Sequence, residues 1–214
     1  MRAIRLLGRA LGLMWLAGCA SGRRPLPNDV ASYIAAHPGS IGTIGYAIAH
    51  GCLFAGMPQG LAQFILGSQA RLDSVGSGPG GERTQWTASL GHVGRLQIRL
   101  QGGTLVAWRA QLQRDRLGAW KDISKSRLRR IRGYADANPT IDDEMLYAML
   151  NGCPAIGMDS ATAATALGAP DVVDAIMVEQ GVPGSRWRYR LSLEGGWLEM
   201  DWAKERVIGW WVRE

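Results

Sequence analysis

The length and charge of this chain limit what kind of protein it can be. Its 214 residues, 47% of them hydrophobic, are enough for one large or two small domains with ordinary cores. The formal net charge of +6 falls to +3 without residues 1–18, because Arg2, Arg5 and Arg9 leave with that segment and no acid does. This mild basic balance, without a recognisable nucleic-acid module, argues against nucleic-acid binding.

Residues 1–18 have the shape of a bacterial export signal. Two early arginines precede Leu6–Leu16, an apolar run about half the roughly 20 residues that a membrane-spanning helix needs. Leu16-Ala17-Gly18-Cys19 then resembles the bacterial lipobox. The resemblance implies cleavage after residue 18, a lipid on Cys19 and a tether over residues 19–27. Because no aspartate follows Cys19, it also implies sorting to the outer membrane.

The rest of the chain contains an internal duplication. The offset is 101 residues and becomes 102 near the end of each copy. Matches of Gly, Cys, Met and Trp in register are not expected by chance. They include Gly51-Cys52 with Gly152-Cys153, Gly56-Met57 with Gly157-Met158, and Trp86 with Trp187. We therefore predict two units, residues 28–110 and 134–214, joined by a connector over residues 111–133.

The first unit is predicted to end in a sheet. The glycine-rich residues 76–81 indicate a mobile connector into its first strand. Ile98 and Leu100 alternate with polar residues, Gly102-Gly103 is a turn signal, and residues 104–110 close the sheet.

The connector carries a cluster of positive charge. Residues 114–132 hold eight basic residues against two acids, a net charge of +6. Such a run is typical of a solvated connector, and it could also hold anionic lipid headgroups. The candidate lipid contacts are Lys125, Arg127, Arg129, Arg130 and Arg132.

The second unit has the clearer element signals. Thr140 is a candidate N-cap for a helix that ends near Asn151, and a second helix begins at Asp159 or Ser160 and ends at Gly168. A period of two then predicts strands over residues 187–193, 198–202 and 207–212. Each unit is thus predicted as two helices followed by a three-stranded antiparallel sheet, and the fold class is α+β. The helices should cover the apolar face of the sheet.

Several of these motifs resemble a known family. Gly157-Met158-Asp159, Leu167-Gly168-Ala169-Pro170 and Trp187-Arg188-Tyr189 are similar to the SmpA/OmlA (BamE-like) domain of envelope lipoproteins. The first copy carries Gly56-Met57 and Trp86, but Ser68-Gln69 replace a residue and a proline of the family. The two-copy beta-lactamase inhibitor proteins are also similar. The SmpA/OmlA resemblance implies a helix-and-sheet fold, an envelope location and a binding scaffold without catalytic residues.

Cys52 and Cys153 occupy equivalent positions and leave two alternatives open. Free cysteine is among the most buried residue types, so buried thiols are the first expectation. A disulfide could form instead in an oxidising compartment, but the equivalent positions meet only if the units pack about a near two-fold axis.

No group of residues predicts catalysis or a cofactor. A cysteine peptidase needs a thiolate beside a positioned histidine, and His37, His50 and His92 occur only in the first copy. No paired Cys/His spacing suggests zinc, and the glycine-rich loop lacks the Lys and Ser/Thr of a phosphate loop. We expect no catalytic residue, metal, cofactor or small-molecule substrate.

Exposed tryptophan near a sheet edge is a candidate contact for a partner. Three tryptophans qualify, although core packing is the default for each: Trp197, Trp210 and Trp211. The sequence thus predicts a periplasm-facing outer-membrane lipoprotein. It would act as a non-enzymatic scaffold that binds an envelope protein, in outer-membrane protein assembly or envelope integrity. The alternative is an inhibitor-type protein that binds an enzyme through its two sheets.

Overall fold

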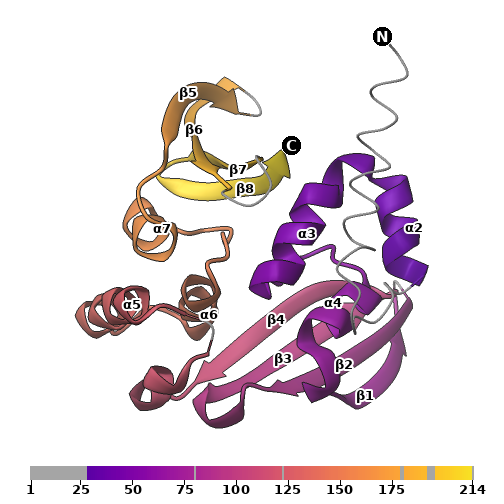
Figure 1. Cartoon of the computed structure of the whole chain (residues 1–214). Helices are drawn as coiled ribbons and strands as arrows, with labels where there is room; N and C mark the ends of the chain where they lie inside the picture. The colour runs from indigo at the N-terminus through magenta and orange to yellow at the C-terminus, as the bar shows by residue number, and fades with distance from the viewer. Residues whose placement is uncertain (1–27, 80, 122, 179–180, 192–195, 214) are drawn as a thin grey trace, which may run out of the picture.

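The computed structural model describes residues 28–79, 81–121, 123–178, 181–191 and 196–213 (Figure 1). Cys19 and the predicted signal and tether lie outside these residues. The first half contains helices α2 (Asn28–Ala36), α3 (Ile41–His50) and α4 (Gln59–Leu66), then strands β1 (Ala70–Gly78), β2 (Gly81–Ser89), β3 (Gly94–Gln101) and β4 (Thr104–Leu112). The second half contains helices α5 (Lys125–Ala137), α6 (Asp143–Asn151) and α7 (Ser160–Leu167), then strands β5 (Val172–Val178), β6 (Val182–Arg190), β7 (Trp197–Ala203) and β8 (Arg206–Arg213).

Each half forms an antiparallel sheet of four strands, in the orders β1-β2-β3-β4 and β5-β6-β7-β8. The α+β class is correct, but the predicted three strands per unit are wrong. The first strand of each sheet was missed. Strand β1 includes residues 76–78 of the predicted mobile connector and pairs with β2 from Ala70↔Ala88 to Gly78↔Gly81. Because β1 is exposed along nearly its whole length, its sequence need not alternate, and the backbone ladder defines the strand.

Each half also has a helix that the sequence did not predict. Helix α5 begins inside the predicted connector, where the Ser124 hydroxyl accepts a hydrogen bond from the Arg127 amide at 3.3 Å. Its partly or fully buried stripe contains Leu128, Ile131 and Ala135, at the helical spacing of one face. Helices α2 and α5 end at residues 36 and 137. Their ends are therefore separated by the 101-residue offset of the duplication, and the two helices are equivalent. Residues 125–133 of the predicted connector are therefore helical and have a counterpart in the first half.

The start of α7 is confirmed and the predicted cap of α6 is corrected. Asp159 caps α7, which begins at Ser160, through a 2.8 Å bond from the Thr162 amide. Helix α6 is capped by Asp142, which accepts from the Met145 amide at 2.6 Å. Thr140 lies outside the helix, because a carboxylate two residues nearer the first turn occupies the cap position.

The middle helix of each half packs against the sheet of the other half, an arrangement that we call the helix exchange. Helix α3 packs against strand β8 of the other half, and α6 packs against β4 (Figure 1). Both strands lie at sheet edges, and each edge gains a side-chain partner from the opposite half: Val212 N donates to Thr43 Oγ1 at 3.0 Å, and Leu112 N donates to Asp143 Oδ2 at 2.8 Å. Edges covered in this way are protected from pairing with other chains.

The exchange produces one hydrophobic core. Buried residues of both halves, such as Ile44, Met57, Leu146 and Met158, belong to a single continuous cluster. Glycine at position 42 allows helix α3 to lie close to strand β8: a Cβ on Gly42 would lie 2.9 Å from Val212 Cγ1. Within the described residues, no helix is long and apolar enough to cross a membrane.

Candidate functional site

The two cysteines meet at the junction between the halves. Helices α3 and α6 end at Gly51 and Gly152, whose φ angles of +71° and +73° are left-handed, and this turn directs the following residue into the core. Cys52 and Cys153 are buried and form a disulfide in the structure. The first expectation, two buried free thiols, is therefore wrong here. The reason is the near two-fold packing that the helix exchange creates.

Hydrogen bonds across the junction follow the same symmetry. The Tyr46 hydroxyl donates to the Gly152 carbonyl at 2.6 Å, and the Tyr147 hydroxyl donates to the Gly51 carbonyl at 3.0 Å. Burial raises the pKa of both tyrosines above the ordinary value, so both hydroxyls stay protonated and keep donating. The disulfide and the two tyrosine hydrogen bonds make the junction rigid, and neither cysteine is a free thiol in the structure.

The three candidate tryptophans lie on two different surfaces. Trp210 packs edge-on against Tyr46 and Phe54, with ring centroids 6.1 and 5.8 Å apart, so it belongs to the junction. Trp197 and Trp211 are half-buried on the opposite face of the second sheet. We call the face of each sheet that points away from its helices the open face.

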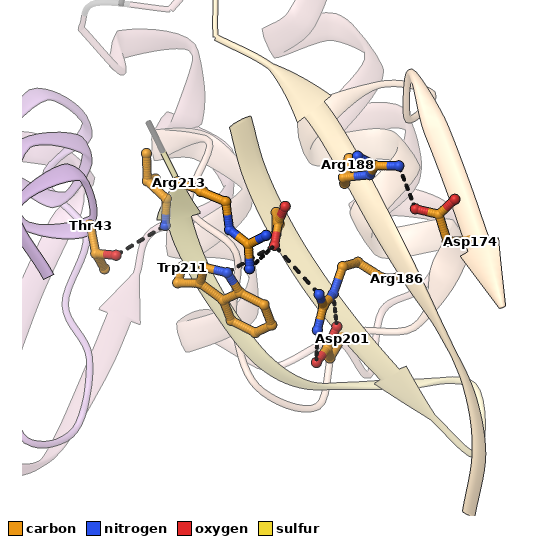
Figure 2. Close-up of polar contacts among 9 residues, drawn as sticks. Thr43, Asp174, Arg186, Arg188, Asp201, Trp211 and Arg213 are labelled. Carbon is orange, nitrogen blue, oxygen red and sulfur yellow. Dashed lines mark hydrogen bonds and ion pairs between the residues drawn. The ribbon is translucent and has the colours of Figure 1, made fainter. Parts of the chain in front are cut away.

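The open face of the second sheet neutralises its own charges. Arg186 binds Asp201 through two hydrogen bonds of 2.7 and 3.0 Å and approaches Glu199 at 3.7 Å (Figure 2). Glu199 is only 3% exposed, and it also accepts from Trp211 Nε1 at 2.9 Å and pairs with Arg213 at 3.4 Å. Hydrogen bonding to Asp201 raises the pKa of Arg186.

The outer part of this face is paired in the same way. Arg188 pairs with Asp174 on β5 at 2.6 Å (Figure 2). Arg188 and Arg190 also lie over the Trp197 ring, at 5.6 and 5.2 Å from its centroid. Arg186, Arg188 and Arg213 thus pair with carboxylates of the same sheet, and Arg190 stacks on an aromatic ring. Most of the positive charge of this face is neutralised by its own acids.

The open face of the first sheet has a different composition. Strand pairing places arginines and glutamines side by side on it, at alternate positions of β2, β3 and β4. The exposed arginines of this face are Arg71, Arg83, Arg95, Arg99 and Arg109. Its one described acid is Asp73, which accepts a hydrogen bond from Thr87. Among the described residues, none forms an ion pair with an arginine of this face.

A continuous depression runs along the same face. One cavity of about 620 Å³ is lined by Arg83, Gln85 and Arg99 among others. A second, of about 260 Å³, shares Gln85 and Arg99 with it and adds Gln97 and Arg109. We call these five residues the arginine-glutamine groove. Hydrogen-bonding side chains and positive charge without a described ionic partner coincide in this groove.

The sequence contained a signal for this groove that the search for reactive groups missed. Arg95, Gln97, Arg99 and Gln101 occur at every second position of one strand, between the core residues Leu96, Ile98 and Leu100. The apolar half of that alternation was recognised as the core side. The polar half marks the groove.

Two residues of the predicted basic cluster bind backbone carbonyls of neighbouring helices. Arg127 donates to the Met149 carbonyl at 2.7 Å, and Arg130 donates to the Thr165 carbonyl at 3.0 Å. Both bind carbonyls in the last turns of neighbouring helices, which favour positive charge. Lys125, Arg129 and Arg132 are exposed on α5, and lipid contact by these three stays a prediction.

No described group has the donors of a metal centre: His, Cys, Asp and Glu nowhere gather in threes within the part of the chain that the structure describes. His50 Nδ1 lies 3.2 Å from the Asn151 carbonyl across the junction, and His37 Nδ1 lies 3.1 Å from the Tyr33 carbonyl in its own helix.

Comparison with known proteins does not identify this chain. No family model, no curated protein and no solved structure matches it. The resemblance to the SmpA/OmlA domain therefore stays a prediction from the motifs quoted above.

Proposed function

We propose that this protein is a non-enzymatic binding scaffold, exported and held at a bacterial outer membrane by a lipid on Cys19. The observation that supports a binding role most is the arginine-glutamine groove, because it presents hydrogen-bonding side chains that form no ion pair with any described residue. Exposed, unpaired and aligned arginines are a feature of surfaces that recognise other molecules.

The junction supports the same proposal. A disulfide, two reciprocal tyrosine bonds and a shared core hold the halves together. Rigid surfaces bind without a large ordering cost. The disulfide also fits an oxidising compartment such as the periplasm, since structural disulfides are rare in the bacterial cytosol.

The anchor is tested by fractionation of cells that make either the native chain or Cys19→Ser. We expect the native chain to carry an acyl label and to sediment with outer membranes, whereas the variant loses both properties. An unacylated native chain with an intact N-terminus in the soluble extract would contradict the proposed anchor.

The scaffold role is tested by crosslinking in intact cells. A photoreactive residue at Gln97, within the groove, should capture a specific envelope protein, and the same residue at the exposed Ala119 serves as the control. Capture of an outer-membrane assembly or envelope-integrity component supports the scaffold. Stoichiometric capture of one soluble enzyme would replace it with the inhibitor alternative.

A further inference from the structure

We infer that the arginine-glutamine groove binds an acidic polypeptide segment, whose carboxylates take the place of those that the second sheet supplies for itself. This inference deepens the proposed scaffold role by naming the chemistry of the partner. It rests on a comparison of equivalent positions in the two units.

The second sheet shows how a carboxylate fits this scaffold. At the offset of 102, Asp201 corresponds to Arg99 and Glu199 to Gln97. In the second sheet these two acids neutralise Arg186 and Arg213. The same backbone positions in the first sheet carry an arginine and a neutral amide.

Strand pairing concentrates the resulting positive charge. Arg99 lies opposite Ala107 on β4 and opposite Gln85 on β2, so the residues that face it across the sheet supply no carboxylate. Arg109 lies opposite Gln97, and Arg83 lies opposite Gln101. None of the described residues supplies a carboxylate to this row, and we assign that role to a ligand that carries negative charge.

The kinds of side chain favour polypeptide over other polyanions. Every cation of the groove is arginine, whose planar fork binds carboxylates and phosphates alike through two hydrogen bonds, so the neighbouring amides decide between them. Gln85 and Gln97 each offer a donor and an acceptor, which match the backbone N–H and C=O groups of an extended peptide. Proteins that bind single-stranded nucleic acid usually stack its bases on aromatic side chains. The aromatic residue beside the groove, Trp108, has its ring against Tyr147 at 5.4 Å between centroids.

The test measures binding of a fluorescent peptide in which glutamate alternates with alanine. The full chain, purified in a neutral detergent, is titrated at low salt, and a peptide with glutamine in place of glutamate is the ligand control. We expect saturable binding of the acidic peptide only. It should weaken as salt shortens the Debye length from about 10 Å at 0.1 M to about 3 Å at 1 M.

Three variants test whether peptide binding depends on the groove or on the overall positive charge of the protein. Arg99→Asp, which installs the residue found at the equivalent position of the second sheet, should weaken binding at least about tenfold, the range for a charge-assisted hydrogen bond. Arg109→Gln should weaken it less, because it removes a charge without reversing it. Arg129→Asp makes the same charge change on the exposed face of α5 and should leave binding within about twofold.

Three outcomes would overturn the inference. The acidic peptide does not bind the native chain, or Arg129→Asp weakens binding as much as Arg99→Asp, or Arg99 is needed for binding to vesicles of phosphatidylglycerol and not to the peptide. An unchanged unfolding midpoint for each variant shows that the fold is intact, and Arg109→Gln provides the test should Arg99→Asp fail to fold. The scaffold role itself is judged separately by the crosslinking experiment.

Discussion

Removal of the disulfide between the halves should destabilise the whole protein. Cys52 and Cys153 are 101 residues apart. In the loop-entropy model, closing a loop of that length lowers the conformational entropy of the unfolded chain and thereby raises its free energy by about 4–5 kcal/mol. Residual structure in the unfolded chain reduces such values, so we expect Cys52→Ala with Cys153→Ala to lower the free energy of unfolding by about 2–5 kcal/mol. That is a large part of the roughly 5–15 kcal/mol that stabilises a typical domain.

Urea unfolding, followed by tryptophan fluorescence, measures this loss. The single variants provide the sharper criterion, because each one already breaks the bridge. Cys52→Ala, Cys153→Ala and the double variant should therefore lose nearly the same free energy, and dithiothreitol should reduce the native chain to the same level. If the free energy lost by the double variant equals the sum of the losses of the two single variants, the reasoning is refuted. Such additivity is the behaviour of two independent buried thiols.

Three further changes test the junction and a helix cap. Gly42→Ala should destabilise the protein relative to Gly45→Ala in the same helix, because a Cβ at Gly42 meets strand β8 at 2.9 Å and one at Gly45 meets nothing within 4 Å; thermal unfolding ranks the pair. Tyr46→Phe should cost about 1–2 kcal/mol in urea unfolding, because it leaves a buried carbonyl without its donor. Asp159→Ala should cost about 0.5–2 kcal/mol as the loss of an N-cap. Burial raises the pKa of Asp159, but hydrogen bonds from Thr162 and the charge of Arg206 leave it lowered below 3.8, so this difference should be full at neutral pH and shrink as the pH falls below about 4.

The elements that the sequence predicted correctly are those with a local chemical signal. Helix α7 begins at Ser160 beside its Asp159 cap, and the alternation around Trp187 and Tyr189 corresponds to strand β6. Turn residues and side-chain periodicity act over a few positions, so they can be read from one segment. The same applies to the Gly102-Gly103 turn, which joins β3 to β4.

The missed elements depend on partners elsewhere in the chain. Strand β1 is exposed over most of its length and contains two glycines, so pairing with β2 defines it. Helix α5 has arginine-rich composition that obscured its apolar stripe, although Leu128, Ile131 and Ala135 carried the signal. The disulfide required knowledge of the near two-fold packing, which arises from the exchange of α3 and α6 and which periodicity does not encode.

The groove could be predicted from the sequence only in part. The alternation of arginine and glutamine in β3 is visible in the sequence, but its meaning depends on which residues face it across the sheet. In the second sheet, β6 and β8 bring arginines to the acids of β7. In the first sheet, β2 and β4 place glutamine and alanine opposite Arg99 of β3, and Arg109 of β4 lies opposite Gln97.

This contrast argues for function in the first sheet and for stability in the second. Both units keep the same strand order and nearly the same register, so the backbone of the first sheet could carry the same acids. A sheet face selected only to remain soluble would tolerate those pairs, which carry little cost at a surface. Arg99 and Arg109 are instead diagonal neighbours on this face, and like charges in that arrangement repel one another weakly in the free protein. A bound ligand with negative charge converts that repulsion into attraction, which gives the unpaired row a role that solubility does not require.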